Sequence, residues 1–202
     1  MNRNLFLLIL SQVFGFTAAT VTVFISGIIG SDLSSIKTLS TLPPSIYVVG
    51  TAAATIFAAK IMSIIGRRLG FIFASVAGSI SCLIGAYAIM IESFLIFCFA
   101  KFILGATMAF THQYRFAAAE SVEKEKAPKA ISSLLLAGIV AAFLGISLSN
   151  YTKGFVSDYL YVGSYLTLAI LTIIPSFLFF FFKDIKEVSL GSNENIKSRK
   201  YI

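Results

Sequence analysis

Charged side chains are scarce in this chain: they make up 12% of its 202 residues, whereas hydrophobic residues make up 57%. A soluble domain carries roughly 25% charged and 45–50% apolar residues. This shortage of charge argues against a soluble globular protein. Twenty phenylalanines, no tryptophan and a mean hydropathy of +0.91 fit an apolar exterior. The composition therefore predicts a protein whose solvent is largely lipid.

Residues that support catalysis are equally scarce. The two cysteines, Cys82 and Cys98, lie in apolar segments without metal-ligand or disulfide spacing, which is typical of small buried hydrophobic residues. With His112 as the single histidine, an HExxH zinc site is excluded, and neither a GxSxG elbow nor a GxxxxGK[ST] phosphate loop occurs. We interpret His112 as an interfacial polar residue and expect no enzyme activity, metal or cofactor.

The net charge of +7 raises the question of a nucleic-acid partner. The basic residues do not gather on one hydrophilic domain. Instead they lie in short gaps between apolar runs, which is the pattern of cytoplasmic loops in membrane proteins. We therefore expect the lipid bilayer, and no nucleic acid, as a partner.

Six apolar runs are long enough to cross a bilayer as helices, which takes about 20 residues each. The first run is longer than the roughly 7–15 residues of a signal-peptide core, so we expect a retained helix. Membrane strands alternate over only about 10 residues, which excludes a barrel. The predicted fold is all-α: a six-transmembrane-helix bundle over residues 1–184 and a polar cytoplasmic tail over 185–202. The predicted spans are 5–30, 44–65, 69–91, 94–111, 130–149 and 161–182.

The distribution of lysine and arginine predicts the orientation of this bundle. If the amino end is inside, 13 of the 16 basic residues fall on the inner side. The outer loops hold only Lys37 and Lys153, and Lys101 lies within the fourth span. Such a bias marks cytoplasmic loops. We expect an integral multi-pass protein of the cytoplasmic (inner) membrane with both termini in the cytoplasm.

Small residues recur at four-residue spacing in several spans and create smooth helix faces. Gly145 follows Ala137 and Ala141 in the fifth span, with Gly138 beside them, and Gly105 lies in the fourth span. Helices in lipid approach closely at such faces. We expect Gly105, Gly138 and Gly145 to serve helix packing, either in an interface that slides or rocks or in plain bundle packing.

Two polar side chains lie deep in the predicted membrane. Lys101 is seven residues into its span, about 10 Å of helical rise. A charge at that depth faces a cavity or a partner, which favours a proton-carrying or anion-attracting role, unless the side chain snorkels to the outer interface. Gln12 in the first span either lines a polar cavity or hydrogen-bonds to another helix. Both are candidates for a substrate or coupling pathway.

The loop between the second and third spans carries A-K-I-M-S-I-I-G-R-R at residues 59–68. It resembles the signature of the major facilitator superfamily, roughly G-x-L-x-D-R-x-G-R-R between helices two and three. Gly66, Arg67 and Arg68 match this signature, and Ser63 stands at the family's aspartate. The resemblance implies that these four residues belong to a cytoplasmic gate loop.

The fourth span adds a second match, because Lys101-x-x-x-Gly105 is similar to the family's Arg-x-x-x-Gly pattern on helix four. In several members the basic residue at that place is linked to proton coupling. Lysine keeps the charge of arginine but loses its bidentate fork. The resemblance therefore implies a coupling role for Lys101.

The resemblance extends from the first to the sixth span. Members of the family bind substrate between two six-helix halves, each a pair of inverted three-helix repeats. The chain is thus expected to be the amino-terminal half of a 12-helix fold, acting as a homodimer or with a separate second half. The implied function is transport of a small-molecule substrate by alternating access. A truncated, transport-inactive membrane protein and a non-transport interaction component are the alternatives.

Overall fold

The computed structural model describes residues 2–183, and all regular structure in that range is helical. Two short 3-10 turns, η1 (Lys37–Leu39) and η2 (Lys124–Lys126), precede α3 and α7. The predicted cytoplasmic tail, 185–202, lies outside the described residues. The α-helices are α1 (Arg3–Gly15), α2 (Thr17–Leu33), α3 (Leu42–Ile65), α4 (Arg67–Met90), α5 (Phe94–Thr111), α6 (Tyr114–Glu120), α7 (Ala127–Thr152) and α8 (Val162–Phe179).

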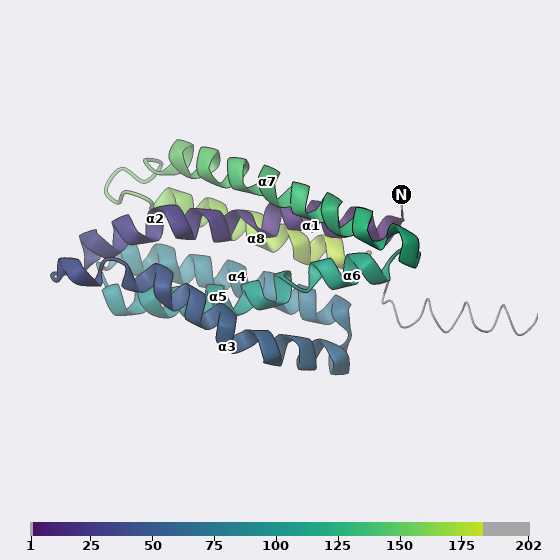
Figure 1. Cartoon of the computed structure of the whole chain (residues 1–202). Helices are drawn as coiled ribbons and strands as arrows, with labels where there is room; N and C mark the ends of the chain where they lie inside the picture. Colours follow the sequence, from purple (N-terminus) through teal and green to yellow (C-terminus); the bar gives the residue numbers. More distant parts are fainter. Residues whose placement is uncertain (1, 184–202) are drawn as a thin grey trace, which may run out of the picture.

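Six helical segments are long and apolar enough to cross a membrane, and they run lengthwise in one bundle (Figure 1). The prediction of an all-α bundle with six such helices is confirmed. The helices extend beyond several predicted spans; the fourth segment, predicted to end at 111, continues through α6 to Glu120. The six segments are Arg3–Leu33, Lys37–Ile65, Arg67–Met90, Phe94–Glu120, Lys124–Thr152 and Val162–Phe179.

Two of the six segments are interrupted within their length. The first is divided at Phe16, where the Thr17 hydroxyl donates to the carbonyl of Phe14 at 2.6 Å. A threonine that bonds its own helix backbone in this way tends to bend the helix. The fourth is divided at His112 and Gln113, where the Gln113 N–H bonds a carbonyl only three residues back at 3.0 Å. The first and fourth segments are thus each divided into two α-helices.

The helix pairs follow the symmetry that two inverted three-helix repeats would produce. The most extensive contacts join α3 to α5 and α4 to α8, while α7 packs along both α1 and α2. In such an exchange the first segment takes the place of the fourth, the second that of the fifth, and the third that of the sixth. The pair of α3 with α5 then becomes the pair of α7 with α1 and α2. The same exchange converts the α4–α8 pair into itself. The pairing therefore matches the half-fold that the resemblance implies.

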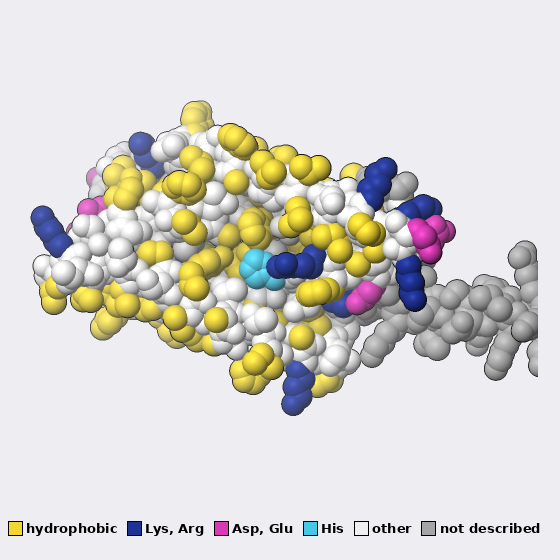
Figure 2. Space-filling model, viewed as in Figure 1, with side chains coloured by type: hydrophobic (Ala, Val, Ile, Leu, Met, Phe, Trp, Pro, Cys, Tyr) yellow, Lys and Arg dark blue, Asp and Glu magenta, His cyan; other side chains and the backbone are white. Residues whose placement is uncertain are grey.

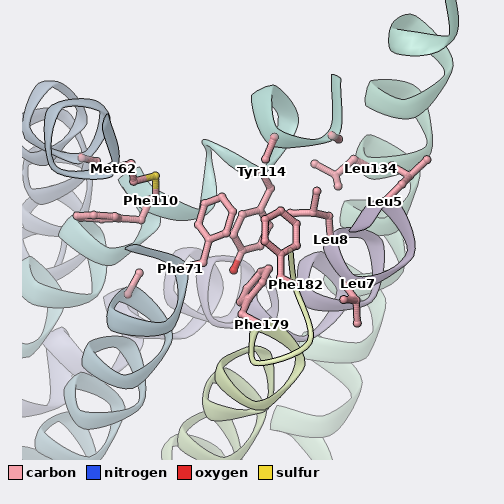
Figure 3. Packing of buried hydrophobic residues seen from close by; sticks show 14 of the residues in the cluster. Leu5, Leu7, Leu8, Met62, Phe71, Phe110, Tyr114, Leu134, Phe179 and Phe182 are labelled. Atoms are coloured by element: carbon pink, nitrogen blue, oxygen red, sulfur yellow. The ribbon is translucent and has the colours of Figure 1, made fainter. Parts of the chain in front are cut away.

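An aromatic cluster closes the core at the end of the bundle where the chain begins (Figure 3). Phe71 of α4 lies 4.7 Å from Tyr114 of α6 and 4.9 Å from Phe179 of α8, measured between ring centroids. Phe182 follows at 5.8 Å from Phe179. All four rings are almost completely buried. The Phe71–Tyr114 and Phe179–Phe182 pairs are edge-to-face and the Phe71–Phe179 pair is tilted. Aromatic pairs add about 0.5–1.5 kcal/mol each beyond area burial, so the cluster ties α4, α6 and α8 together.

Most of the described basic residues lie at this same end, which we call the basic end. Figure 2 shows dark-blue and magenta side chains gathered there. Because successive segments are antiparallel, the start of α1, the α3–α4 turn, the α6–α7 connection and the end of α8 meet at this end. The opposite end carries Lys37 and Lys153. The basic end is defined by Arg3, Lys60, Arg67, Arg68, Lys124, Lys126, Lys129 and Lys183.

Candidate functional site

Lys101 is enclosed where α2, α5 and α8 meet, and only 1% of its surface is exposed. Its ammonium donates hydrogen bonds to the Thr22 hydroxyl, at 3.3 Å, and to the Tyr165 hydroxyl. The nitrogen also lies 4.9 Å from the ring centroid of Phe97 and 4.2 Å from that of Tyr165, which suits cation–π attraction. Neither ion pair within residues 2–183 includes Lys101. Two hydroxyls and two rings are thus its surroundings.

This burial decides between the two interpretations of Lys101. A snorkelling lysine would carry its ammonium to the membrane surface. The Lys101 ammonium is enclosed by Thr22, Phe97 and Tyr165 instead, which argues against snorkelling. Ionisable groups held within a membrane bundle are costly and characteristically mark ion, proton or substrate pathways. A coupling role for Lys101 stays a prediction.

Gln12 lies on α1 opposite α7 and is 7% exposed. Its amide nitrogen is 3.6 Å from the place that a Cβ on Gly138 would occupy. The amide oxygen is buried and has no hydrogen-bond partner among the described residues, as is also true of the neighbouring Ser11 hydroxyl. The predicted interhelical bond is therefore not made by this oxygen. An unpaired buried acceptor costs about 1–3 kcal/mol, which leaves Gln12 open to a hydrogen-bond donor.

The predicted gate loop forms a tight turn between α3 and α4. Gly66 ends α3, donates its N–H to Met62 at 3.1 Å, and has φ 86° and ψ 158°. Essentially only glycine adopts that backbone conformation without strain. Ser63 donates its hydroxyl to the Lys60 carbonyl at 2.7 Å, so it bonds its own helix. The glycine of the loop is thus required by the turn itself.

Arg67 makes a bidentate ion pair with Glu120 at the end of α6. Its Nε lies 2.9 Å from Oε2 and its Nη2 lies 2.5 Å from Oε1. This pair links the start of α4 to the carboxyl end of the fourth segment. The sequence prediction did not identify Glu120, because it placed that residue in a loop after the fourth span. The signal available was a carboxylate closing the helical stretch Tyr114–Glu120 beside a run of basic residues.

The three glycines predicted to serve packing differ in how tightly they are approached. A Cβ on Gly105 would lie 2.0 Å from the Tyr47 carbonyl oxygen, because α3 and α5 touch backbone to backbone. A Cβ on Gly145 would lie 2.9 Å from the Thr17 carbonyl oxygen. At Gly138 the nearest atom is the flexible end of Gln12, at ordinary contact distance. Of the three, only Gly105 and Gly145 therefore lie where a helix packs directly against the backbone of its neighbour.

The structure shows a polar spot, formed by His112 and Arg115, on an otherwise apolar face. The sequence did not identify it. Figure 2 shows this face, built by α7, α1, α2, α5, α6 and α3, with the single histidine, His112, near its middle and a basic side chain against it. That basic side chain is Arg115, whose Nε donates to the His112 carbonyl at 3.0 Å. The His112 ring also packs edge-on against Phe16 at 6.0 Å. The interruptions of the first and fourth segments therefore meet here.

Arg115 is exposed on this face and forms neither of the ion pairs found in residues 2–183. A guanidinium among apolar side chains on a membrane helix faces water or a protein partner rather than hydrocarbon. We call the face of α1, α2, α3, α5, α6 and α7 that carries His112 and Arg115 the front face.

The remaining reactive groups are few. Cys82 and Cys98 are buried free thiols, as expected from their apolar surroundings. Residues 2–183 contain no cluster of three or more His, Cys, Asp or Glu side chains with the placement of a metal site. What the described residues offer is charge, hydroxyl groups and aromatic rings in a bundle, which are means of binding and coupling.

A family model described as Major Facilitator Superfamily matches residues 5–200. The chain therefore belongs to the major facilitator superfamily, and it is an integral, multi-pass membrane protein. Its six-helix architecture and its loop signature agree with that family. No solved structure matches the chain.

Among individual proteins, the chain is similar to "Riboflavin transporter RfnT" of Brucella anthropi, with 33% identity over 84% of the chain and 42% of that protein. It is also similar to two Bacillus subtilis proteins described as uncharacterized MFS-type transporters. YddS is 24% identical over 77% of the chain and 36% of its own length, and YdeG is 24% identical over 76% and 36%. The chain thus spans about two fifths of the length of these relatives. Their descriptions are those of transporters, which fits a protein that is not an enzyme.

Proposed function

We propose that the chain forms one six-helix wall of a secondary transporter that moves a small solute by alternating access. The observation that carries this proposal is the family match over residues 5–200, together with a 33% identical relative that is named a transporter. In this family the solute is bound between two six-helix bundles that rock against each other. The second bundle is then either another copy of the chain or a separate chain.

The front face is the surface that the second bundle would cover. Its helices α3 and α7 expose most of their apolar side chains, whereas α4 and α8 lie behind them (Figure 1). His112 and Arg115 add a polar spot where a solute or a partner carboxylate is received. A face that combines apolar helix surface with one exposed cation is better suited to a solute pathway than to lipid alone.

Within this proposal, Lys101 and Gln12 act from behind the front face. Both lie inside the bundle, so neither touches the solute directly in the conformation described. Lys101 joins α2 to α8 through Thr22 and Tyr165, and a change in its protonation would alter both hydrogen bonds. We propose that this junction couples ion or proton movement to rocking of the bundle.

The basic end would face the cytoplasm, in the plasma membrane, because basic loops stay on that side. The turn at Ser63, Gly66, Arg67 and Arg68 would then belong to the cytoplasmic gate. The Arg67–Glu120 ion pair supports this role, since it ties the turn to the end of the fourth segment, which is divided into α5 and α6.

Riboflavin is the first solute to test, because the 33% identical relative carries that name. The full chain would be purified, reconstituted in vesicles, and assayed for entry of radiolabelled riboflavin with and without a proton gradient. We expect saturable uptake that is lost in Lys101→Ala and retained in Lys153→Ala, which removes an exposed lysine at the opposite end.

Folded protein that takes up no riboflavin or other small solute, either alone or with a second six-helix chain present, would contradict the transport proposal. It would instead favour a transport-inactive chain or an interaction component. Uptake that is unchanged in Lys101→Ala would contradict the coupling role while leaving transport standing.

A further inference from the structure

A groove of about 480 Å³ opens at the basic end, between the starts of α1 and α4 and the chain that follows α8. Three basic side chains border it: Arg3, Arg68 and Lys183. The rest of the lining is apolar and comes from Leu69 and Ile72 of α4 and from residues 180–182. No acidic residue belongs to the described lining. The groove therefore joins a cluster of positive charge to a hydrophobic wall.

Specific contacts hold these walls in place. The Asn4 side chain pairs with the backbone of Lys183: its Nδ2 donates to the Lys183 carbonyl at 2.8 Å, and its Oδ1 accepts the Lys183 N–H at 3.2 Å. Arg3 donates from Nη2 to the Phe181 carbonyl at 2.8 Å. Phe182 is inserted into the aromatic cluster (Figure 3). These contacts fix the chain after α8 against α1 and so define the walls of the groove.

One donor in the groove lacks an acceptor. The Nε of Arg68 is buried and has no hydrogen-bond partner among the described residues. Arg68 also takes part in neither ion pair within residues 2–183, in contrast to its neighbour Arg67. Guanidinium groups bind phosphate and carboxylate through charge-assisted, often bidentate hydrogen bonds. The arrangement calls for an anionic group that brings several acceptor oxygens.

We propose that this groove binds an anionic phospholipid, with its phosphate on Arg3, Arg68 and Lys183. The position favours lipid over a soluble anion, because the groove lies where membrane-spanning helices end and headgroups lie. The apolar wall of Leu69, Ile72 and Phe180 gives an acyl chain a surface to follow. Basic pockets between membrane helices bind anionic headgroups by the same combination of charge and apolar contact. This inference does not depend on the transport activity.

The test compares thermal unfolding of the full chain in two lipid compositions. The chain is reconstituted in phosphatidylcholine vesicles or in an equimolar mixture of phosphatidylcholine and phosphatidylglycerol. Unfolding is followed by reaction of the buried thiols of Cys82 and Cys98 with a fluorogenic maleimide. We expect phosphatidylglycerol to raise the unfolding midpoint of the wild-type chain. Inorganic phosphate added to phosphatidylcholine vesicles should not reproduce the rise, which separates a lipid phosphate from a free one.

Arg68→Gln should abolish the rise caused by phosphatidylglycerol, and Lys183→Gln should reduce it. If Arg68→Gln does not fold, Lys183→Gln still tests the proposal, because Lys183 is exposed and its substitution leaves the fold intact. Lys153→Gln, at the opposite end, is the matched control and should respond as the wild type does. A rise that is equal in wild type, Arg68→Gln and Lys183→Gln would overturn the proposal. So would equal destabilisation of Arg68→Gln in both lipids, which would point to a purely structural role of Arg68.

Discussion

Replacing Gly105 by alanine should force α3 and α5 apart. A Cβ at this position would lie 2.0 Å from the Tyr47 carbonyl oxygen and 3.1 Å from the Thr51 backbone nitrogen. The nearest obstacle is backbone, which no change of side-chain rotamer can move. The reciprocal position is equally tight, because a Cβ on Gly50 would lie 2.3 Å from the Phe102 carbonyl oxygen. The substitution therefore probes a backbone-to-backbone helix contact.

The size of the effect follows from these distances. An unstrained carbon–oxygen approach is about 3.3 Å, so the helices must separate by about 3.3 − 2.0 = 1.3 Å at this point. That separation would break the 2.9 Å hydrogen bond from the Thr51 hydroxyl to the Gly105 carbonyl. Overpacking costs about 1–3 kcal/mol and an interhelical hydrogen bond about 0.6, against a gain of ~1 in helix propensity. We expect a net loss of about 0.6–2.6 kcal/mol.

Two other glycines provide matched controls for the same chemical change. Gly145→Ala should destabilise the fold less than Gly105→Ala, since its Cβ would lie 2.9 Å from a carbonyl oxygen. Gly138→Ala should be neutral or stabilising by up to about 1 kcal/mol, because alanine favours the helix and its neighbour is a flexible side chain.

The assay is thermal unfolding in detergent, read by maleimide labelling of the two buried cysteines. A loss of about 0.6–2.6 kcal/mol corresponds to a midpoint lowered by roughly 1–10 °C in a chain of this size. The expected order of midpoints is Gly138→Ala highest, Gly145→Ala intermediate and Gly105→Ala lowest. A Gly105→Ala chain as stable as the wild type, or less affected than Gly138→Ala, would refute the close approach of α3 and α5.

Three further predictions concern charge and backbone strain. Lys101→Met should retain the unfolding midpoint, since replacing a buried charge by an apolar side chain is often neutral or stabilising, while riboflavin uptake is lost; retained uptake would argue against coupling. Substituting Arg67 and Glu120 by glutamine singly and together should give a coupling energy of about 1 kcal/mol or less that falls with added salt, and a salt-independent value would contradict a half-exposed pair. Gly66→Ala should cost about 1–3 kcal/mol because of its positive φ, whereas Gly154→Ala, with open space around its Cβ, should change stability by less than about 0.5; equal effects would remove the strain argument.

The helical bundle was predictable because lipid imposes a strong and repetitive pattern on sequence. Each span is an apolar run of the required length, and only helices satisfy the backbone throughout such runs. The two interruptions were not predictable in the same way. Neither the break at Phe16 nor that at His112 contains proline. The first depends on a hydrogen bond from the Thr17 hydroxyl and the second on a backbone hydrogen bond from Gln113, and hydropathy reveals neither. The fourth span was predicted to end at residue 111, where α5 does end, but the continuation of this segment through α6 was not predicted.

The candidate site was predictable only where one residue is unusual by itself. Lys101 is conspicuous as a charge in an apolar run, and the turn glycine Gly66 is conspicuous in its loop motif. Tyr165 lies 64 residues from its partner Lys101, and Glu120 lies 53 residues from its partner Arg67. Only the fold brings each pair together. Arg115 was counted for orientation alone, because its exposure on the front face depends on how the fourth segment is divided into α5 and α6.

The most direct test of the account asks whether the front face lines an aqueous pathway. A cysteine is placed at His112 in a chain with Cys82→Ser and Cys98→Ser, and a second chain carries Ile170→Cys on α8, behind the front face. Both are exposed to a membrane-impermeant maleimide in sealed vesicles, with and without riboflavin. We expect His112→Cys to be labelled, with riboflavin slowing the reaction, and Ile170→Cys to stay unlabelled in lipid. A His112→Cys chain as unreactive as Ile170→Cys would contradict a water-filled pathway at this face.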